Sequence, residues 1–389
     1  MQFIPYSRPE ISDNEINEVL DTLKSGWLTT GKKTKLFESM FSKYIGAKHC
    51  LAVNSATAGL HLALEALGVQ KGDKVITTVH TFTATAEVIR YLGADPIFVD
   101  IDAFSFNINC DEVETALISN PDVKVIMPVH FGGQAANMTR IKELAEKYDV
   151  KILEDAAHAL PTTFNGDLIG NIGDITVFSF YANKTITTGE GGMVVTNNDA
   201  YSERIKCMRL HGINRDVFDR FNSLKPTWYY EVIAPGFKYN MTDLAASIGI
   251  HQLDKVELFQ KRREEIANIY SQSFSNLPVK TPSKSRTEDI HSWHLYVIKL
   301  DLDKLLITRD QFIELMSDSG IGTSVHYIPL HLQPYWRDNY NLGEMQFPVS
   351  SMVFKRIVSL PNYPGMSDVE VDRVVSSVTK ILEDNTIVN

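Results

Sequence analysis

The hydrophobic positions between residues 49 and 210 follow two alternating patterns. Short runs of β-branched and aromatic residues predict strands, and apolar residues spaced three and four positions apart predict helices. Strands are expected at 49–53, 74–77, 96–99, 123–128, 151–153, 175–180 and 193–196, and helices at 56–67, 81–91, 111–119 and 138–148. This alternation predicts an α/β domain with a mostly parallel sheet and helices on both faces.

Longer stretches with helical spacing of apolar residues flank this region. The apolar positions predict an amphipathic helix over 9–24 and one long helix over 242–274, with Thr242 as its N-cap. Within the second helix, the charged run 261–265 is expected to form a solvent-exposed face.

A polar connection over 278–288, which contains two prolines, is expected to lead into a smaller unit. Strands at 294–300 and 323–327 and helices at 308–318 and 367–383 give this unit an α+β character. The predicted domains are therefore 1–280 and 281–389.

The composition is that of an ordinary globular chain. Of 389 residues, 44% are hydrophobic and 22% charged, and the formal net charge is −10. A net acidic chain is a poor candidate for binding nucleic acid or an anionic membrane. The three cysteines are scattered, with neither a disulfide framework nor a metal spacing. The first residues show no basic segment followed by an apolar stretch, and no apolar run of about 18 residues occurs, so neither secretion nor membrane spanning is expected. We therefore expect a cytoplasmic protein.

Lys184 lies in the loop between the expected strands 175–180 and 193–196. Apolar surroundings lower the pKa of a lysine amine from about 10.4 and so free it to attack a carbonyl. Asp155 follows another strand, at the carboxyl edge where α/β sheets bind ligands. Pyridoxal phosphate (PLP) needs such a pair: a lysine for its Schiff base and a carboxylate that keeps the pyridine nitrogen protonated.

A phosphate site is expected where residues 51–60 change from a strand, through a turn of small residues, into a helix. The backbone at Ala56 and the hydroxyls of Ser55 and Thr57 suit a phosphate dianion, and Ser55 is equally suited to an ordinary N-cap. Ser179 is expected to face opposite to Phe178 and Phe180.

Three segments carry a family resemblance: Asn54-Ser-Ala-Thr-Ala58, Glu154-Asp-Ala-Ala-His-Ala159, and Phe178-Ser-Phe-Tyr-Ala-Asn-Lys184 with Gly189-Glu-Gly-Gly192. In this order and spacing they resemble the DegT/DnrJ/EryC1/StrS family of sugar-nucleotide aminotransferases, nearly from end to end. Ser25–Gly31 and Gly322–His326 are most similar to members that make spore-coat or lipopolysaccharide sugars. The resemblance implies the fold-type I aminotransferase fold, with PLP as the cofactor.

The resemblance also implies roles for individual residues. Lys184 would hold the cofactor and act as general base and acid, and Asp155 would hold the ring nitrogen protonated. The phosphate would be bound by Ser55, Ala56, Thr57 and Ser179, and His158 would lie beside the ring. Phe82 is expected either to stack on the ring or to pack in the core.

Further residues are implied at the sugar and at the subunit boundary. The sugar nucleotide is expected near Trp27, Thr30, Tyr181 and His326. The chain is expected to form a homodimer in which the element 236–240 reaches the neighbour's cofactor phosphate. Lys238 and Asn240 replace the residues more common there, and Asn240 is favoured for the contact.

Two other patterns are weaker. Gly26–Lys33 nearly matches a phosphate-loop motif, but a helix precedes it and Lys33 stands where a hydroxyl is required, which argues against an ATPase. The histidine pairs His291/His294 and His326/His331 lack a third ligand at suitable spacing, so no metal site is expected.

The sequence thus predicts a PLP-dependent aminotransferase. It would convert a nucleotide-linked keto-deoxysugar, at C4, into an amino sugar for cell-surface polysaccharide, with L-glutamate as the amino donor. Two alternatives are a sugar dehydrase of the same fold and a non-catalytic, ligand-sensing regulator. The dehydrase carries histidine in place of Lys184, and a sensor does not need the lysine, Asp155 and phosphate turn together.

Overall fold

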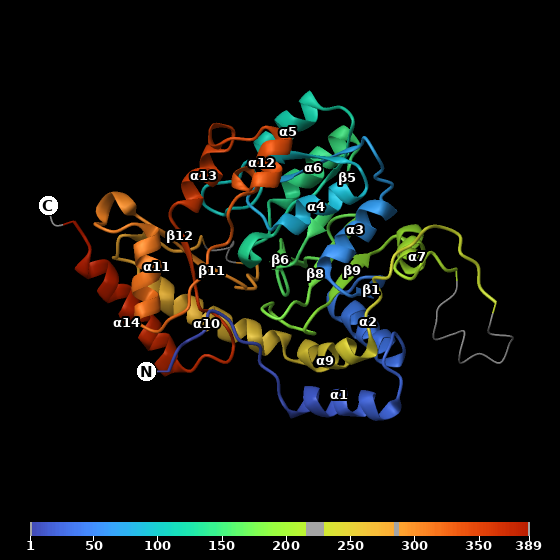
Figure 1. The fold of residues 1–389 in the computed structure, drawn as a ribbon, viewed down its shortest axis with the longest axis horizontal. Coiled ribbons are helices and arrows are strands. Elements are labelled where there is room, and N and C mark those ends of the chain that lie inside the picture. Colours follow the sequence, from blue (N-terminus) through green and yellow to red (C-terminus); the bar gives the residue numbers. More distant parts are fainter. Residues whose placement is uncertain (1, 215–228, 284–287, 388–389) are drawn as a thin grey trace.

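The computed structural model describes residues 2–214, 229–283 and 288–387, so residues 284–287 of the predicted connection lie outside the described part. Within these ranges the central sheet has seven strands in the order β1-β9-β8-β5-β4-β2-β3 (Figure 1). Their bounds are His49–Val53 (β1), Lys74–Thr78 (β2), Asp95–Val99 (β3), Val123–Ile126 (β4), Lys151–Asp155 (β5), Ile175–Ser179 (β8) and Gly192–Thr196 (β9).

The directions of the strands confirm a mostly parallel sheet. Strands from β3 through β8 pair in parallel, and β9 is antiparallel to both β8 and β1. Alternate residues of most strands enter two separate hydrophobic clusters, one on each face, because side chains along a strand point to opposite sides.

Helices cover both faces of the sheet, as predicted. Side chains from α2 (Lys32–Ile45), α5 (Cys110–Ser119), α6 (Met138–Tyr148) and α9 (Asp243–Asp254) pack in one cluster. Those from α3 (Ala56–Ala66), α4 (Thr83–Tyr91) and α7 (Asp199–Met208) pack in the other. Helix α2 was not among the predicted elements, and α4 begins at Thr83, two residues later than expected, with Phe82 at its N-cap.

The predicted long helix over 242–274 is wrong, because α9 ends at Asp254 and α10 runs from Val256 to Ser273. Thr242 does cap α9, accepting a hydrogen bond from Ala245 N over 3.2 Å. At the interruption, Lys255 Nζ lies 2.5 Å from the buried carboxylate of Glu15 in α1 (Asp13–Ser25) and 2.8 Å from Ser12 Oγ. These contacts hold the N-terminal end of α1 against the junction between α9 and α10.

A smaller unit surrounds a second core. It contains β10 (Val279–Lys280), β11 (Tyr296–Leu300), β12 (Ile357–Leu360), α11 (Arg309–Asp318) and α14 (Asp368–Asp384). Helix α13 (Pro348–Phe354) precedes β12, and α12 (Pro334–Tyr340) lies near α4 (Figure 1), where Trp336 Nε1 donates to Thr83 Oγ1 over 3.1 Å. Tyr270 and Phe274, at the end of α10, also pack in this core. The predicted boundary at 280/281 stays a prediction.

Two predictions for the C-terminal half are corrected. Residues 323–327 form no regular strand, only one bridge between Ser324 and Ser359, and the third strand of the small sheet is β12. The charged run 261–265 is not wholly solvent-exposed. Arg263 is buried and donates to the Asn362 carbonyl, because α10 packs under the smaller unit.

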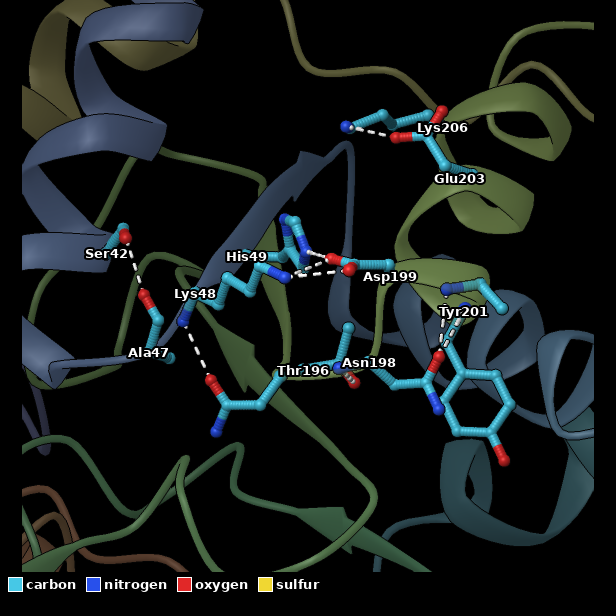
Figure 2. Close-up of polar contacts among 12 residues, drawn as sticks. Ser42, Ala47, Lys48, His49, Thr196, Asn198, Asp199, Tyr201, Glu203 and Lys206 are labelled. Carbon is cyan, nitrogen blue, oxygen red and sulfur yellow. Dashed lines mark hydrogen bonds and ion pairs between the residues drawn. The ribbon is translucent and has the colours of Figure 1, made fainter.

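A surface polar cluster fixes the start of β1 against α7 (Figure 2). Asp199 lies 2.6 Å from His49 Nε2 and 2.7 Å from Lys48 Nζ. Asn198 caps α7 by accepting hydrogen bonds from Ala200 N and Tyr201 N. Exposed ion pairs contribute only about 0–1 kcal/mol each, so these contacts position the strand more than they stabilise the fold.

Among the described residues, no helix is both long enough and apolar enough to cross a membrane.

Candidate active site

A cavity of about 540 Å³ opens where β1, β2, β5 and β8 end. This volume is within the range of roughly 300–1,000 Å³ typical of small-molecule sites. Most of the predicted site residues line it together: Ser55, Ala56, Thr57, Phe82, Asp155, His158, Ser179, Tyr181, Lys184 and His326. Their roles remain predictions, but the structure places them around one space.

Asp155 ends β5 and is almost fully buried. Its Oδ2 accepts a hydrogen bond from Thr85 Oγ1 over 2.8 Å, and its Oδ1 accepts one from Ala157 N over 3.1 Å. Burial raises the pKa of this carboxyl, although the two donors and Lys184 oppose the shift. A positive charge placed against it would favour the ionised form.

Lys184 lies in the loop between β8 and β9. The loop folds back towards the end of β8, where the Phe180 carbonyl accepts hydrogen bonds from Thr188 N over 3.0 Å and Thr187 Oγ1 over 3.1 Å. Burial lowers the pKa of the Lys184 amine to about 8, and Asp155 partly offsets this by favouring the ammonium. An amine with this pKa is partly unprotonated near neutral pH and can act as a nucleophile or base.

The start of α3 supplies the predicted phosphate cradle. Ser55 is the N-cap of α3, and its Oγ accepts a hydrogen bond from Ala58 N over 3.1 Å, so the N-cap alternative is correct. Ser55 also lines the cavity. The first N–H groups of a helix have no partner within it and favour an anion. A Cβ on Gly192 would lie 2.9 Å from Ala56 N, which explains glycine at this position of β9.

Phe82 is 59% exposed at the cavity, so the core-packing alternative is wrong. His158 is buried, and its Nε2 lies 3.0 Å from the Tyr327 hydroxyl. His326 Nδ1 lies 2.8 Å from Ser359 Oγ, so the smaller unit holds this histidine at the cavity.

Three predicted site residues do not line the cavity: Trp27, Thr30 and Asn240. They form a neighbouring bonded group instead. Trp27 Nε1 donates to the Thr30 carbonyl over 3.1 Å, and Asn240 Nδ2 donates to Thr30 Oγ1 over 2.6 Å. Asn240 lines a separate depression, which shares Glu190 with the cavity.

The near match to a phosphate loop is explained by Asp243. Its carboxylate accepts hydrogen bonds from Gly31 N over 2.7 Å and from Thr34 N over 2.9 Å, at the start of α2. The helix start that would bind a phosphate therefore binds a side chain of the same protein. This agrees with the argument against an ATPase.

Among the cavity residues that the sequence did not predict, two make hydrogen bonds to predicted ones: Thr85, which donates to Asp155, and Tyr327, which contacts His158. Nothing in their local patterns distinguishes a threonine inside a helix or a tyrosine after a histidine. Each of the two is recognised as part of the site only through its contact with a residue far away in the sequence.

The residues of the cavity fit PLP. The cofactor requires an amine for covalent attachment, an anion beside its ring nitrogen and an anion-binding cradle for its phosphate. Lys184, Asp155 and the start of α3 supply these three elements around one space of sufficient size. Among the described residues, no three His, Cys, Asp or Glu side chains are grouped to hold a metal ion.

Comparison with known proteins gives matches along nearly the whole chain. The model of the DegT/DnrJ/EryC1/StrS aminotransferase family matches residues 9–379. The spore coat polysaccharide biosynthesis protein SpsC of Bacillus subtilis is 45% identical over 382 residues, covering 98% of this chain and 97% of that protein.

Solved structures agree with the observed fold. A putative sugar aminotransferase from Streptococcus pneumoniae in its PMP form has a TM-score of 0.92 and 34% identity, covering 98% of this chain and 99% of that one. Its PLP form has a TM-score of 0.91, 33% identity and the same coverage. Helicobacter pylori PseC, an aminotransferase involved in the biosynthesis of pseudoaminic acid, has a TM-score of 0.89 and 29% identity over 98% and 100% of the two chains.

These matches confirm the predicted fold-type I fold and the predicted PLP cofactor. The chain belongs to the DegT/DnrJ/EryC1/StrS aminotransferase family.

Proposed function

We propose that this PLP-dependent aminotransferase moves the amino group of L-glutamate onto the C4 keto group of a nucleotide-linked deoxysugar. The product would be an amino sugar for cell-surface polysaccharide, made in the cytoplasm. The observation that carries the proposal is one cavity that joins Lys184, Asp155 and the start of α3. SpsC and PseC, named for spore coat polysaccharide and pseudoaminic acid biosynthesis, support the substrate class.

When bound, PLP withdraws electrons from the substrate carbon that exchanges its proton. Asp155 would hold a positive charge on the ring nitrogen, with Thr85 and Ala157 orienting its two oxygens. The start of α3, with Ser55, Thr57 and Ser179, would bind the phosphate. Phe82, exposed in the cavity, would stack on the ring.

Lys184 would attach the cofactor and move the proton. Its lowered pKa, about 8, leaves it able both to accept and to return a proton near neutral pH. The dehydrase alternative lacks this lysine, and nothing in the structure favours it. A ligand-sensing regulator has no use for a lysine amine with a lowered pKa.

We further propose a homodimer with shared active sites. Helix α1 presents Ile16, Leu20 and Leu23 to solvent, each between 44% and 50% exposed. The apolar depression beside them is lined by Val19, Leu23, Leu244 and Ile248, and also by Asn240. Contiguous apolar surface of this kind is typical of protein interfaces.

The element 238–240 would then serve the partner's cavity. The Asn240 amide is engaged in its own chain, because Oδ1 accepts from Lys238 Nζ over 2.6 Å and Nδ2 donates to Thr30. Lys238 is exposed and its ammonium has further donors. Asn240 would make the contact with the phosphate, with Lys238 as the alternative, so each of the two has to be tested.

The activity is tested first without any sugar. Protein loaded with PLP should absorb visible light, and L-glutamate alone should convert that spectrum as the amino group is transferred. Lys184→Ala should lose both the band and the conversion, because among the described residues that line the cavity no other lysine offers an amine for attachment. Lys206→Ala, at an exposed lysine on α7, is the matched control and should keep both. A Lys184→Ala protein that converts glutamate at the wild-type rate would refute the assignment.

A further inference from the structure

The hydrogen bonds of His158 determine which of its ring nitrogens carries the proton. Gly132 N donates to Nδ1 over 3.2 Å, so Nδ1 is an acceptor. Burial lowers the pKa of His158 well below its ordinary value, and Lys184 and His326 add to this shift, so the ring is neutral. A neutral imidazole has one N–H, which must therefore be on Nε2.

This tautomer sets the direction of the next hydrogen bond. His158 Nε2 lies 3.0 Å from the Tyr327 hydroxyl oxygen. Because Nε2 carries the proton, the histidine donates and the tyrosine oxygen accepts. The hydroxyl hydrogen of Tyr327 must point elsewhere, and the described part of the chain offers it no other hydrogen-bond partner. Tyr327 lines the cavity that also contains Lys184 and Asp155.

The arrangement is held rigidly from the side of His158. Gly132 and Gly133 adopt φ values of +64° and +103°, which side-chain-bearing residues rarely adopt. A Cβ on Gly133 would lie 2.0 Å from Ser292 Oγ, and that hydroxyl donates to the His158 carbonyl over 2.6 Å.

Tyr327 is held equally well. Its ring packs against Phe82 and Phe131, with centroids 5.9 Å and 6.5 Å away. Leu330 N donates to the Val79 carbonyl over 2.8 Å and so anchors the segment to the large sheet. A donor held in advance by its surroundings stabilises developing charge without reorganisation.

We propose that the Tyr327 hydroxyl is a fixed hydrogen-bond donor to an anionic oxygen of a molecule bound in the cavity. This inference rests on the proposed function, which supplies two sources of such an oxygen: the ring oxygen of PLP and the carboxylate of the amino donor. Burial raises the pKa of Tyr327, and the charges of Tyr6 and Asp155 add to the shift, so the hydroxyl keeps its proton at working pH. The other titratable groups lining the cavity are Asp155, His158, Tyr181, Lys184, Glu190 and His326.

The test compares wild-type holoenzyme with Tyr327→Phe, which removes only the hydroxyl. Tyr335→Phe, at an exposed tyrosine on α12, is the matched control. The first measurement is a pH titration of the visible band of lysine-bound PLP without substrate. If the acceptor is the ring oxygen, loss of the donor concentrates negative charge there and raises the midpoint by about one to two pH units.

The second measurement is the Kd of glutarate, a dicarboxylate that lacks an amino group. If the acceptor is the carboxylate of the amino donor, Tyr327→Phe weakens glutarate binding by roughly tenfold or more and leaves the midpoint unchanged. A folded Tyr327→Phe holoenzyme that matches Tyr335→Phe in both measurements would overturn the inference.

A second variant keeps the test decisive if Tyr327→Phe does not fold. Replacement of Tyr327 by 3-fluorotyrosine preserves the ring and makes the hydroxyl a stronger donor. The midpoint should then fall, or glutarate should bind more tightly, and no change in either would again overturn the inference. Failure of the proposed function is separately visible, because wild-type holoenzyme would then not respond to L-glutamate.

Discussion

Thr85 donates a hydrogen bond of 2.8 Å from its hydroxyl to Asp155 Oδ2. Because the hydroxyl hydrogen is used there, the oxygen of Thr85 accepts from Thr81 Oγ1, which is 2.7 Å away. A chain of two threonines at the start of α4 thus orients the carboxylate that ends β5.

We expect Thr85→Val to slow the single-turnover reaction with L-glutamate about tenfold, because a hydrogen bond to a charged group contributes roughly 1.5–3 kcal/mol. Binding of PLP should persist, since Lys184 and the phosphate cradle remain. Thr77→Val is the control, because it removes a buried hydroxyl that donates to the Met127 carbonyl, away from the cavity. Equal rates in the two variants would show that Thr85 does not orient Asp155 for the reaction.

Mixed dimers should reveal the shared site. Lys184→Ala chains and Asn240→Ala chains are each expected to be inactive. When they are unfolded together and refolded, about half of the dimers contain one chain of each kind, and each such dimer has one intact site. Activity should return to roughly a quarter of the wild-type value by this counting.

The control mixture combines Lys184→Ala with Asp155→Asn, two lesions of the same cavity, and should restore nothing. A mixture with Asn240→Ala that also restores nothing, despite verified mixed dimers, would reject the shared site. If the Asn240 variant alone is active, the same experiment with Lys238→Ala identifies the contact.

Glu15 should make stability depend on pH in acid. Burial of its carboxyl disfavours ionisation, but hydrogen bonds from Lys255, Ser12 and Gln252 outweigh burial and lower the pKa from 4.5 to about 2. The folded protein thus binds the proton more weakly than the unfolded chain. The stabilisation is fully present above the unfolded pKa and is lost as the pH falls from about 4.5 towards 2.

Glu15→Gln is therefore expected to lower the free energy of unfolding by about 2–3 kcal/mol near neutral pH, and by progressively less in acid. Urea unfolding of both proteins at a series of pH values measures this difference. A difference that stays constant from about pH 6 to pH 3 would contradict the account of Glu15.

The sheet and the centre of the cavity could be predicted from the sequence for a physical reason. Strands buried on both faces appear as continuous apolar runs, and ligand-binding residues follow their carboxyl ends. Asp155 ends one such strand and Lys184 lies in the loop that follows the neighbouring one, so their proximity follows from the topology.

Residues whose environment depends on distant contacts could not be predicted in this way. Thr85 contacts Asp155, which is 70 positions away in the sequence, and Tyr327 contacts His158, which is 169 positions away. Arg263 has the local pattern of an exposed helix face, but the smaller unit covers it. The spacing of apolar residues also does not indicate the break between α9 and α10 at Lys255. The Lys255 ammonium contacts Glu15 in another helix, and this contact has no local sequence pattern.

The most direct test of the central claim follows the amino group itself. Wild-type holoenzyme is incubated with nitrogen-15 glutamate and a panel of nucleotide-linked 4-keto-deoxysugars, and the products are analysed by mass spectrometry. We predict a labelled amino sugar from at least one member of the panel, together with 2-oxoglutarate, and no such product from Lys184→Ala. A product that has lost water and carries no label, or a labelled product formed equally well by Lys184→Ala, would contradict the account.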